Sequence, residues 1–175
     1  FGDLILHVVK IFEKNEDIKN IYSRNFKYIL VDEYQDTNFI QNKWLNLIIN
    51  KNKNICCVGD DDQSIYSWRG AEIKNFLTFD KIYPECKVYK LEQNYRSTKN
   101  ILETASSLIS NNNSRVGKKL WSSGSSGELV KLNCYSNGKN EAEGVSDIIE
   151  NKIRDKYSLN NVSILVRAIY QTREF

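Results

Sequence analysis

Two short apolar runs in this chain each end in a group of acidic residues. The first run, Tyr28–Val31, leads into Asp32 and Glu33, and the second, Ile55–Val58, leads into three consecutive aspartates. An apolar run of four residues is typical of a strand that is covered on both faces in a parallel sheet. After the first acidic turn, Asn38 and Gln41 have the spacing of a capping box, and apolar residues at helical spacing follow. The order is therefore strand, acidic turn, helix. This order predicts an α/β fold with mostly parallel strands.

The same alternation continues along the chain. Apolar positions recur at helical spacing in several segments, and further short apolar runs lie between them. The predicted helices begin near Leu4, Asn38, Phe76, Thr98 and Ala142, and the further predicted strands span Val88–Leu91, Leu129–Leu132 and Val162–Val166.

The charge balance does not by itself indicate a nucleic-acid-binding protein, because 25 basic residues are nearly matched by 22 acidic ones. Any contact with nucleic acid would have to come from basic residues that are clustered locally. One candidate is the segment Arg115–Lys139, whose basic residues outnumber its single acid, Glu128. A phosphate-facing patch and an ordinary solvated face both fit this segment.

Cysteine and histidine usage gives no metal-binding pattern. The four cysteines include no C-x-x-C pair, so we expect buried, reduced thiols, and His7 lies on a helical pattern without partner ligands. No apolar run is long enough to span a membrane, and a cytoplasmic location is expected. The chain contains no methionine and starts at Phe1, from which we expect a piece of a longer protein.

The acidic pair after the first run has a chemical interpretation. Ligands of open α/β folds bind at the carboxyl edge of the sheet, where Asp32 and Glu33 are predicted to lie. Asp32 could hold Mg²⁺, with Glu33 beside it as a further oxygen ligand or as the general base for a water aimed at a phosphate. A strand that ends in an acidic turn by chance is the simpler alternative.

Three longer strings resemble a known family. Val31-Asp32-Glu33-Tyr34-Gln35-Asp36-Thr37 is similar to motif II of the UvrD/Rep/PcrA family of superfamily 1 DNA helicases. The string from Val58 to Ala71, with Gln-Ser-Ile-Tyr-Ser-Trp-Arg-Gly at its centre, resembles motif III, and Leu91–Thr98 resembles motif IV. The three occur in the family's order, and the resemblance spans nearly the whole chain.

The resemblance implies roles for individual residues. Asp32 and Glu33 would serve Mg²⁺ and ATP hydrolysis, and Gln63 would sense the γ-phosphate of ATP. Tyr66, Trp68 and Arg69 would contact single-stranded DNA, including its junctions with duplex, and base stacking on such rings is worth roughly 1–3 kcal/mol per base.

Motif IV implies the rest of the nucleotide site. Tyr95 would stack on the adenine of ATP, and Arg96 would reach the γ-phosphate as an arginine finger does. The P-loop pattern G-x-x-x-x-G-K-[ST] is missing from the 175 residues, so we expect this chain alone to be inactive. The predicted architecture is two incomplete RecA-like motor domains, residues 1–91 with motifs II and III and residues 92–175 with motif IV.

The parent protein is therefore predicted to be an ATP-dependent 3′-to-5′ DNA helicase with repair or replication partners and no membrane. Two alternatives stay open. A decayed or split helicase remnant could act only as a DNA-binding or protein-binding module. The parent could also be the helicase subunit of a helicase-nuclease that resembles AddA or RecB.

Overall fold

The computed structural model describes residues 2–113 and 115–175. Phe1, where the first predicted domain starts, and Ser114 lie outside the described residues. The chain divides into two compact units, Phe1–Glu128 and Leu129–Phe175.

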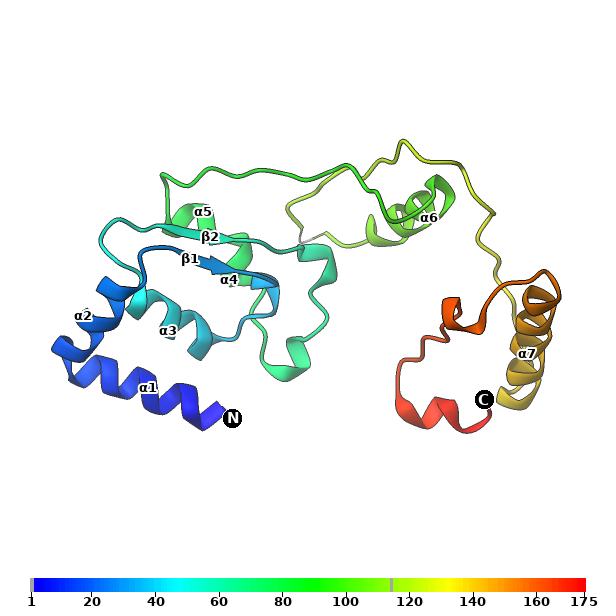
Figure 1. Ribbon diagram of the computed structural model, residues 1–175, viewed down its shortest axis with the longest axis horizontal. Coiled ribbons are helices and arrows are strands. Elements are labelled where there is room, and N and C mark those ends of the chain that lie inside the picture. The colour runs from blue at the N-terminus through cyan, green and yellow to red at the C-terminus, as the bar shows by residue number, and fades with distance from the viewer. Residues whose placement is uncertain (1, 114) are drawn as a thin grey trace. The chain divides into compact units, whose positions relative to one another are not determined.

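Helices dominate the first unit (Figure 1). Its helices and strands are α1 (Gly2–Lys14), α2 (Glu16–Asn25), β1 (Ile29–Val31), α3 (Phe39–Ile48), β2 (Ile55–Cys57), α4 (Lys74–Leu77), α5 (Phe79–Ile82) and α6 (Lys99–Ile109). Its single-turn 3₁₀ helices are η1 (Tyr34–Asp36), η2 (Asp61–Gln63) and η3 (Ser67–Arg69). The second unit contains α7 (Gly138–Arg154), η4 (Leu159–Asn161) and η5 (Ile169–Arg173).

The two strands form a small parallel sheet, with Ile29 opposite Ile55 and Val31 opposite Cys57. Helix α3 makes the crossover between them, as parallel pairing requires. Its predicted capping box is present: the Asn38 side chain accepts from the Gln41 backbone N–H, and the Gln41 side chain accepts from the Asn38 N–H, both at 2.9 Å. Mixed helices with a small parallel sheet agree with the α/β class predicted from the sequence.

One face of the sheet carries the core of the first unit. Phe12 of α1, Tyr34 of η1, and Leu45 and Ile48 of α3 are buried together, and the inward side chains of both strands pack against them. Each such side chain contributes roughly 1.5–3 kcal/mol by leaving water. Helices α1, α2 and α3 gather beside the strands in Figure 1.

The other face of the sheet is open, which corrects the prediction of strands covered on both faces. Leu30 and Cys56 are opposite each other in the register and point away from the core, and the Leu30 side chain is 80% exposed. The predicted burial of all four cysteines is wrong: Cys56 is exposed on this open face, and Cys134, in the second unit, is also exposed. All four thiols are free, as expected of reduced cysteines.

Three predicted strands do not form. Val88–Leu91, Leu129–Leu132 and Val162–Val166 are irregular in the described chain. A strand is defined by its backbone hydrogen-bond partner, and among the described residues these segments have no neighbouring strand. Only a single parallel bridge, between Gln93 and Trp121, follows the first of them.

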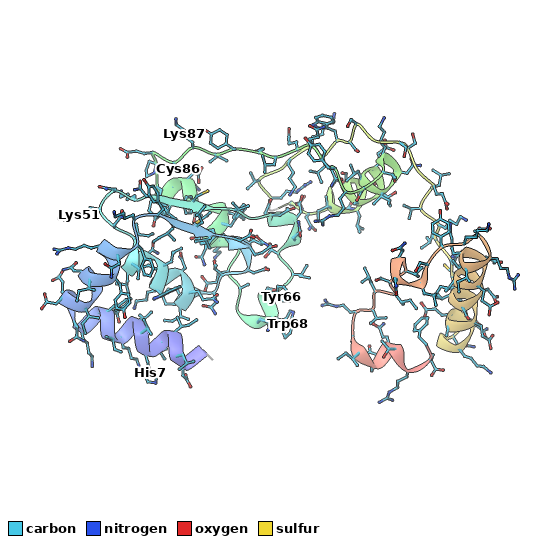
Figure 2. All side chains as sticks on the ribbon, in the orientation of Figure 1. His7, Lys51, Tyr66, Trp68, Cys86 and Lys87 are labelled. Carbon is cyan, nitrogen blue, oxygen red and sulfur yellow. The ribbon has the colours of Figure 1, made fainter. Side chains whose placement is uncertain are left out.

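The helical predictions fared better. Helices begin close to each predicted start, but the segment after Phe76 divides into α4 and α5. His7 lies exposed on α1 (Figure 2). In the part of the chain that the structure describes, no helix is both long and apolar enough to cross a membrane.

Candidate active site at the carboxyl edge of the sheet

The two acidic loops meet at the carboxyl edge of the sheet, as the parallel order predicts. The Val58 N–H donates to the Val31 carbonyl at 2.8 Å, and the Tyr34 N–H donates to the Val58 carbonyl at 3.0 Å. These two bonds extend the pairing past the last strand residues. They hold the turn after β1 directly against the loop after β2.

Asp32 and Glu33 are both exposed at this edge. Glu33 adopts the left-handed backbone conformation (φ 49°), which few residues other than glycine favour, and its N–H donates to Asp32 Oδ1 at 2.9 Å. Glu33 Oε2 accepts from Gln35 Nε2 at 2.7 Å. In the described chain, the second oxygen of each carboxylate has no hydrogen-bond partner, so it is available to a ligand.

Gln35 joins the two loops. Its side chain is 1% exposed, its Nε2 donates to Glu33, and its Oε1 accepts from the Asp60 N–H at 3.0 Å. Asp60 Oδ2 in turn accepts from Gln63 Nε2 at 2.7 Å. A continuous series of hydrogen bonds thus runs from Glu33 to Gln63, two residues that the sequence predicted for one site.

A partly buried hydrogen-bond network connects η1 to α3 and α4. Tyr34 donates its hydroxyl hydrogen to Asn42 Oδ1 at 2.8 Å, Asn42 donates to Asn75 Oδ1 at 3.1 Å, and Asn75 donates to the Thr37 carbonyl at 3.4 Å. Burial, with smaller contributions from Cys57 and Tyr83, raises the pKa of Tyr34 to about 12. The hydroxyl therefore stays protonated and keeps its role as a donor near neutral pH.

Two of the three aspartates after β2 form ion pairs with basic residues of the segment after α6. Arg115 binds Asp62 through two parallel hydrogen bonds of 2.9 and 2.6 Å, and Lys118 donates to Asp60 and lies 3.8 Å from Asp62. Asp61 accepts from the Val116 backbone N–H at 2.6 Å.

These contacts shift the ionisation of the triplet. Burial alone would raise the pKa of Asp60, but hydrogen bonds from Lys118 and Gln63 outweigh burial and hold the pKa of Asp60 below its ordinary value. The Asp62 hydrogen bonds raise the pKa of Arg115.

The carboxylates of the triplet lie close enough together to hold a metal ion, but two of the three already have counter-charges from the protein. For Arg115 and Lys118 this answers the question that the sequence left open, because they face carboxylates rather than solvent. Lys119 and Lys131 are exposed.

Tyr66, Trp68 and Arg69 form an exposed cluster on the loop that carries η3. Figure 2 labels its two rings, Tyr66 and Trp68. The two ring centroids are 6.4 Å apart, and the Arg69 guanidinium carbon lies 5.2 Å from the Tyr66 ring and 5.5 Å from the Trp68 ring. Trp68 is 72% exposed. Core packing does not account for Trp68, and Tyr66 is 36% exposed, so the cluster presents apolar ring surface and a positive charge to solvent.

Tyr95 and Arg96 are also exposed, in the turn before α6. The Tyr95 hydroxyl donates to Gln93 Oε1 at 2.7 Å, and the Arg96 N–H donates to Asn94 Oδ1 at 2.9 Å. The turn lines a shallow hollow with residues 122–125. Among the described residues, no hydrogen bond or ion pair joins Tyr95 or Arg96 to Glu33 or Gln63, so the structure does not bring these two groups together.

Sequence reasoning missed Gln35, Arg115 and Lys118 as parts of this site. In the sequence, Gln35 is one residue of motif II with no role assigned to it, and its burial depends on contact with the loop after β2. Arg115 and Lys118 lie more than 50 positions from their partners in the chain. A basic segment that contains a single acid was the available signal for them.

Comparisons with known proteins add the family. Residues 1–84 match the model of the UvrD/REP helicase N-terminal domain, and residues 89–175 match that of the UvrD-like helicase C-terminal domain. The chain is 50% identical over 177 residues to a protein of Rickettsia felis named probable DNA helicase II homolog, aligning along its whole length with 27% of that protein.

Two further relatives agree. The chain is 44% identical over 173 residues to the ATP-dependent DNA helicase PcrA of Staphylococcus epidermidis, with 99% of the chain and 24% of that protein aligned. It is 43% identical over 173 residues to DNA helicase II of Haemophilus influenzae, with the same shares aligned. The chain thus spans about a quarter of the length of these curated relatives. By its two matched segments, the chain belongs to the UvrD-like helicase family.

Proposed function

We propose that the longer protein containing this chain is an ATP-dependent DNA helicase or translocase that moves 3′ to 5′ on single-stranded DNA. The observation that carries the proposal is the hydrogen-bond series from Glu33 through Gln35 and Asp60 to Gln63 at the carboxyl edge of the sheet. This series connects Glu33 and Gln63, whose relative positions a site for ATP hydrolysis needs to hold fixed. The relatives, which are named DNA helicase II and ATP-dependent DNA helicase PcrA, support the same activity.

The donor set fits Mg²⁺. Asp32 and Glu33 are adjacent, exposed, and each has a carboxylate oxygen without a protein partner in the described chain, and hard cations prefer such oxygens. Mg²⁺ would neutralise charge on the phosphates of ATP when bound. Asp32 is the proposed ligand, with Glu33 adjacent to it.

Glu33 is the proposed general base. Its free Oε1 would take a proton from water directed at the γ-phosphate, and such proton transfer contributes typically 10²–10⁴-fold to rate. Gln63 would report on the γ-phosphate, since its amide can donate to phosphate oxygen or accept from water. Its present bond to Asp60 would have to open for contact with nucleotide.

The remaining residues complete the proposal. Tyr95 would stack on adenine, and Arg96 would bring a fixed positive charge to the γ-phosphate when the two motor domains, residues 1–91 and 92–175, close on ATP. Tyr66, Trp68 and Arg69 would bind single-stranded DNA by stacking and charge, and their exposure supports this role. The chain alone has no P-loop and is proposed to be inactive.

The test is Glu33→Gln in the full-length protein. We expect DNA-stimulated ATP hydrolysis to fall by roughly 10²–10⁴-fold, because the amide cannot accept the proton. Binding of single-stranded DNA, measured by fluorescence anisotropy, should stay within about twofold and serves as the folding control. A normal hydrolysis rate in this variant would refute the assignment. A full-length wild-type protein that binds DNA without hydrolysing ATP would favour the non-enzymatic alternative.

A further inference from the structure

Gln35 is the most deeply buried polar residue beside the proposed catalytic edge, and both ends of its amide are used. Nε2 donates to a carboxylate oxygen of Glu33 at 2.7 Å, and Oε1 accepts from the Asp60 N–H at 3.0 Å. A carboxylate oxygen only accepts and a backbone N–H only donates, so a single orientation of the amide satisfies both. Neither an ionised carboxylate nor an apolar side chain can make the same pair of bonds.

The bond to Glu33 restrains a side chain that would otherwise move freely. Glu33 is exposed and stands on a left-handed backbone, while Gln35 is held by η1 within the core. Occupying Oε2 leaves Oε1 as the oxygen that faces a ligand. The orientation of the proposed base is therefore set by a buried partner rather than by its own exposed surroundings.

The bond to Asp60 extends the restraint to the loop after β2. Asp60 caps η2 by accepting from the Asp62 N–H at 3.0 Å and also accepts from Gln63. The backbone here is tightly fitted, because a Cβ on Gly59 would lie 2.6 Å from Gln35 Oε1 and 2.8 Å from the Phe76 ring. Gln35 therefore packs closely between the two loops, and the space at Gly59 does not admit a side chain.

We propose that Gln35 is a positioning residue: it orients the Glu33 carboxylate and ties it to the loop of Gln63, so that the base and the γ-phosphate sensor keep a fixed relation. The proposal rests on the proposed ATPase function. Gln35 itself touches neither nucleotide nor water in this scheme and acts through Glu33.

The test compares Gln35→Glu with wild type in the full-length protein, with DNA present. The variant keeps the size of the side chain and an acceptor for Asp60, and in its ionised form it loses the donor and places a second carboxylate beside Glu33. We expect kcat for ATP hydrolysis to fall about 10–100-fold, as for lost outer partners of a catalytic group. Binding of a non-hydrolysable ATP analogue should stay within about twofold. The acidic limb of the pH–rate profile should move to higher pH, because the added carboxylate opposes ionisation of Glu33.

Two further variants separate positioning from structure. Gln41→Glu makes the same chemical change at the capping box of α3, where a glutamate serves equally well, and should change kcat less than twofold. In a Glu33→Gln background, Gln35→Glu should cause no further loss of kcat, because its effect passes through Glu33.

Three results would overturn the proposal: a kcat within twofold of wild type, an equal loss of kcat in the Glu33→Gln background, or a parallel loss of nucleotide binding. Gln35→Met, which removes both polar ends but keeps the length, guards against misfolding of the glutamate variant. It should lower kcat without moving the acidic limb. If neither variant folds by circular dichroism, the role of Gln35 is structural and the proposal is wrong. Full activity in Glu33→Gln alone would refute the assignment of Glu33 as the base, whereas a wild-type protein that does not hydrolyse ATP would overturn the proposed function.

Discussion

The two acidic loops of the first unit lie at the same edge of the same sheet but have opposite electrostatic surroundings. Asp32 and Glu33, after β1, have no ion pair among the described residues, and their partners are an N–H and a neutral amide. Asp60 and Asp62, after β2, bind Lys118 and Arg115. Acid content alone therefore does not identify a cation site. What distinguishes the two loops is whether the protein supplies the cation itself.

The largest effect is expected from a substitution in the first of the two loops, the one after β1. Asp32→Asn in the full-length protein should lower kcat/KM for Mg²⁺-dependent ATP hydrolysis by about 10² or more, since a lost metal contact costs several kcal/mol of transition-state stabilisation. Steady-state hydrolysis over a range of Mg²⁺ concentrations measures it.

Asp61→Asn is the matched control, because an amide oxygen still accepts from the Val116 N–H. Hydrolysis by this control should stay within about threefold of wild type. A larger loss in the control than in Asp32→Asn would reverse the roles assigned to the two loops.

The second effect concerns stability. Lys118→Ala leaves Asp60 and Asp62 partly buried without one of their cations, and hydrogen bonds to charged groups are worth about 1.5–3 kcal/mol. We expect the free energy of unfolding of the chain to fall by about that amount, measured by urea titration of tryptophan fluorescence. Lys119→Ala removes an exposed neighbouring lysine and should change it by less than about 0.5 kcal/mol. Equal effects would show that the ion pairs do not stabilise the loop.

The smallest effect is the pH dependence of the same stability. The pKa of Asp60 is lower in the folded chain than its ordinary value of 3.8, so the folded state binds fewer protons than the unfolded state. Its contribution is complete above pH 3.8 and is lost as the pH falls through the folded pKa. Asp60→Asn should therefore flatten the acid limb of a stability–pH curve. An unchanged limb would contradict the role of Asp60.

Prediction from the sequence succeeded where the determining interactions are local. The capping box of α3 involves residues three positions apart, and the amphipathic pattern of α1 places Val9 and Phe12 in the core. The turn chemistry after β1 also placed Asp32 and Glu33 correctly at the sheet edge.

The failures share a cause, which is that the missing information lies in a distant segment. Val88–Leu91 has strand composition, but a strand needs a neighbour, and composition does not supply one. Leu30 is exposed because nothing in the described chain covers the second face of β1. Arg115 was assigned only to a basic segment, because its partner Asp62 is 53 positions away. Gln35 was missed because its role depends on contacts with two separate loops, at Glu33 after β1 and at Asp60 after β2.

The left-handed backbone of Glu33 has a consequence for how this site could change under selection. Lys53 adopts the same conformation (φ 51°) in the turn before β2. A glycine at either position would relieve a conformational cost of about 1–2 kcal/mol. At Lys53 the exchange sacrifices only an exposed lysine, whereas at Glu33 it removes the proposed base. Selection for stability alone would favour glycine at both positions, so a glutamate at position 33 marks a place where stability and the proposed chemistry are opposed.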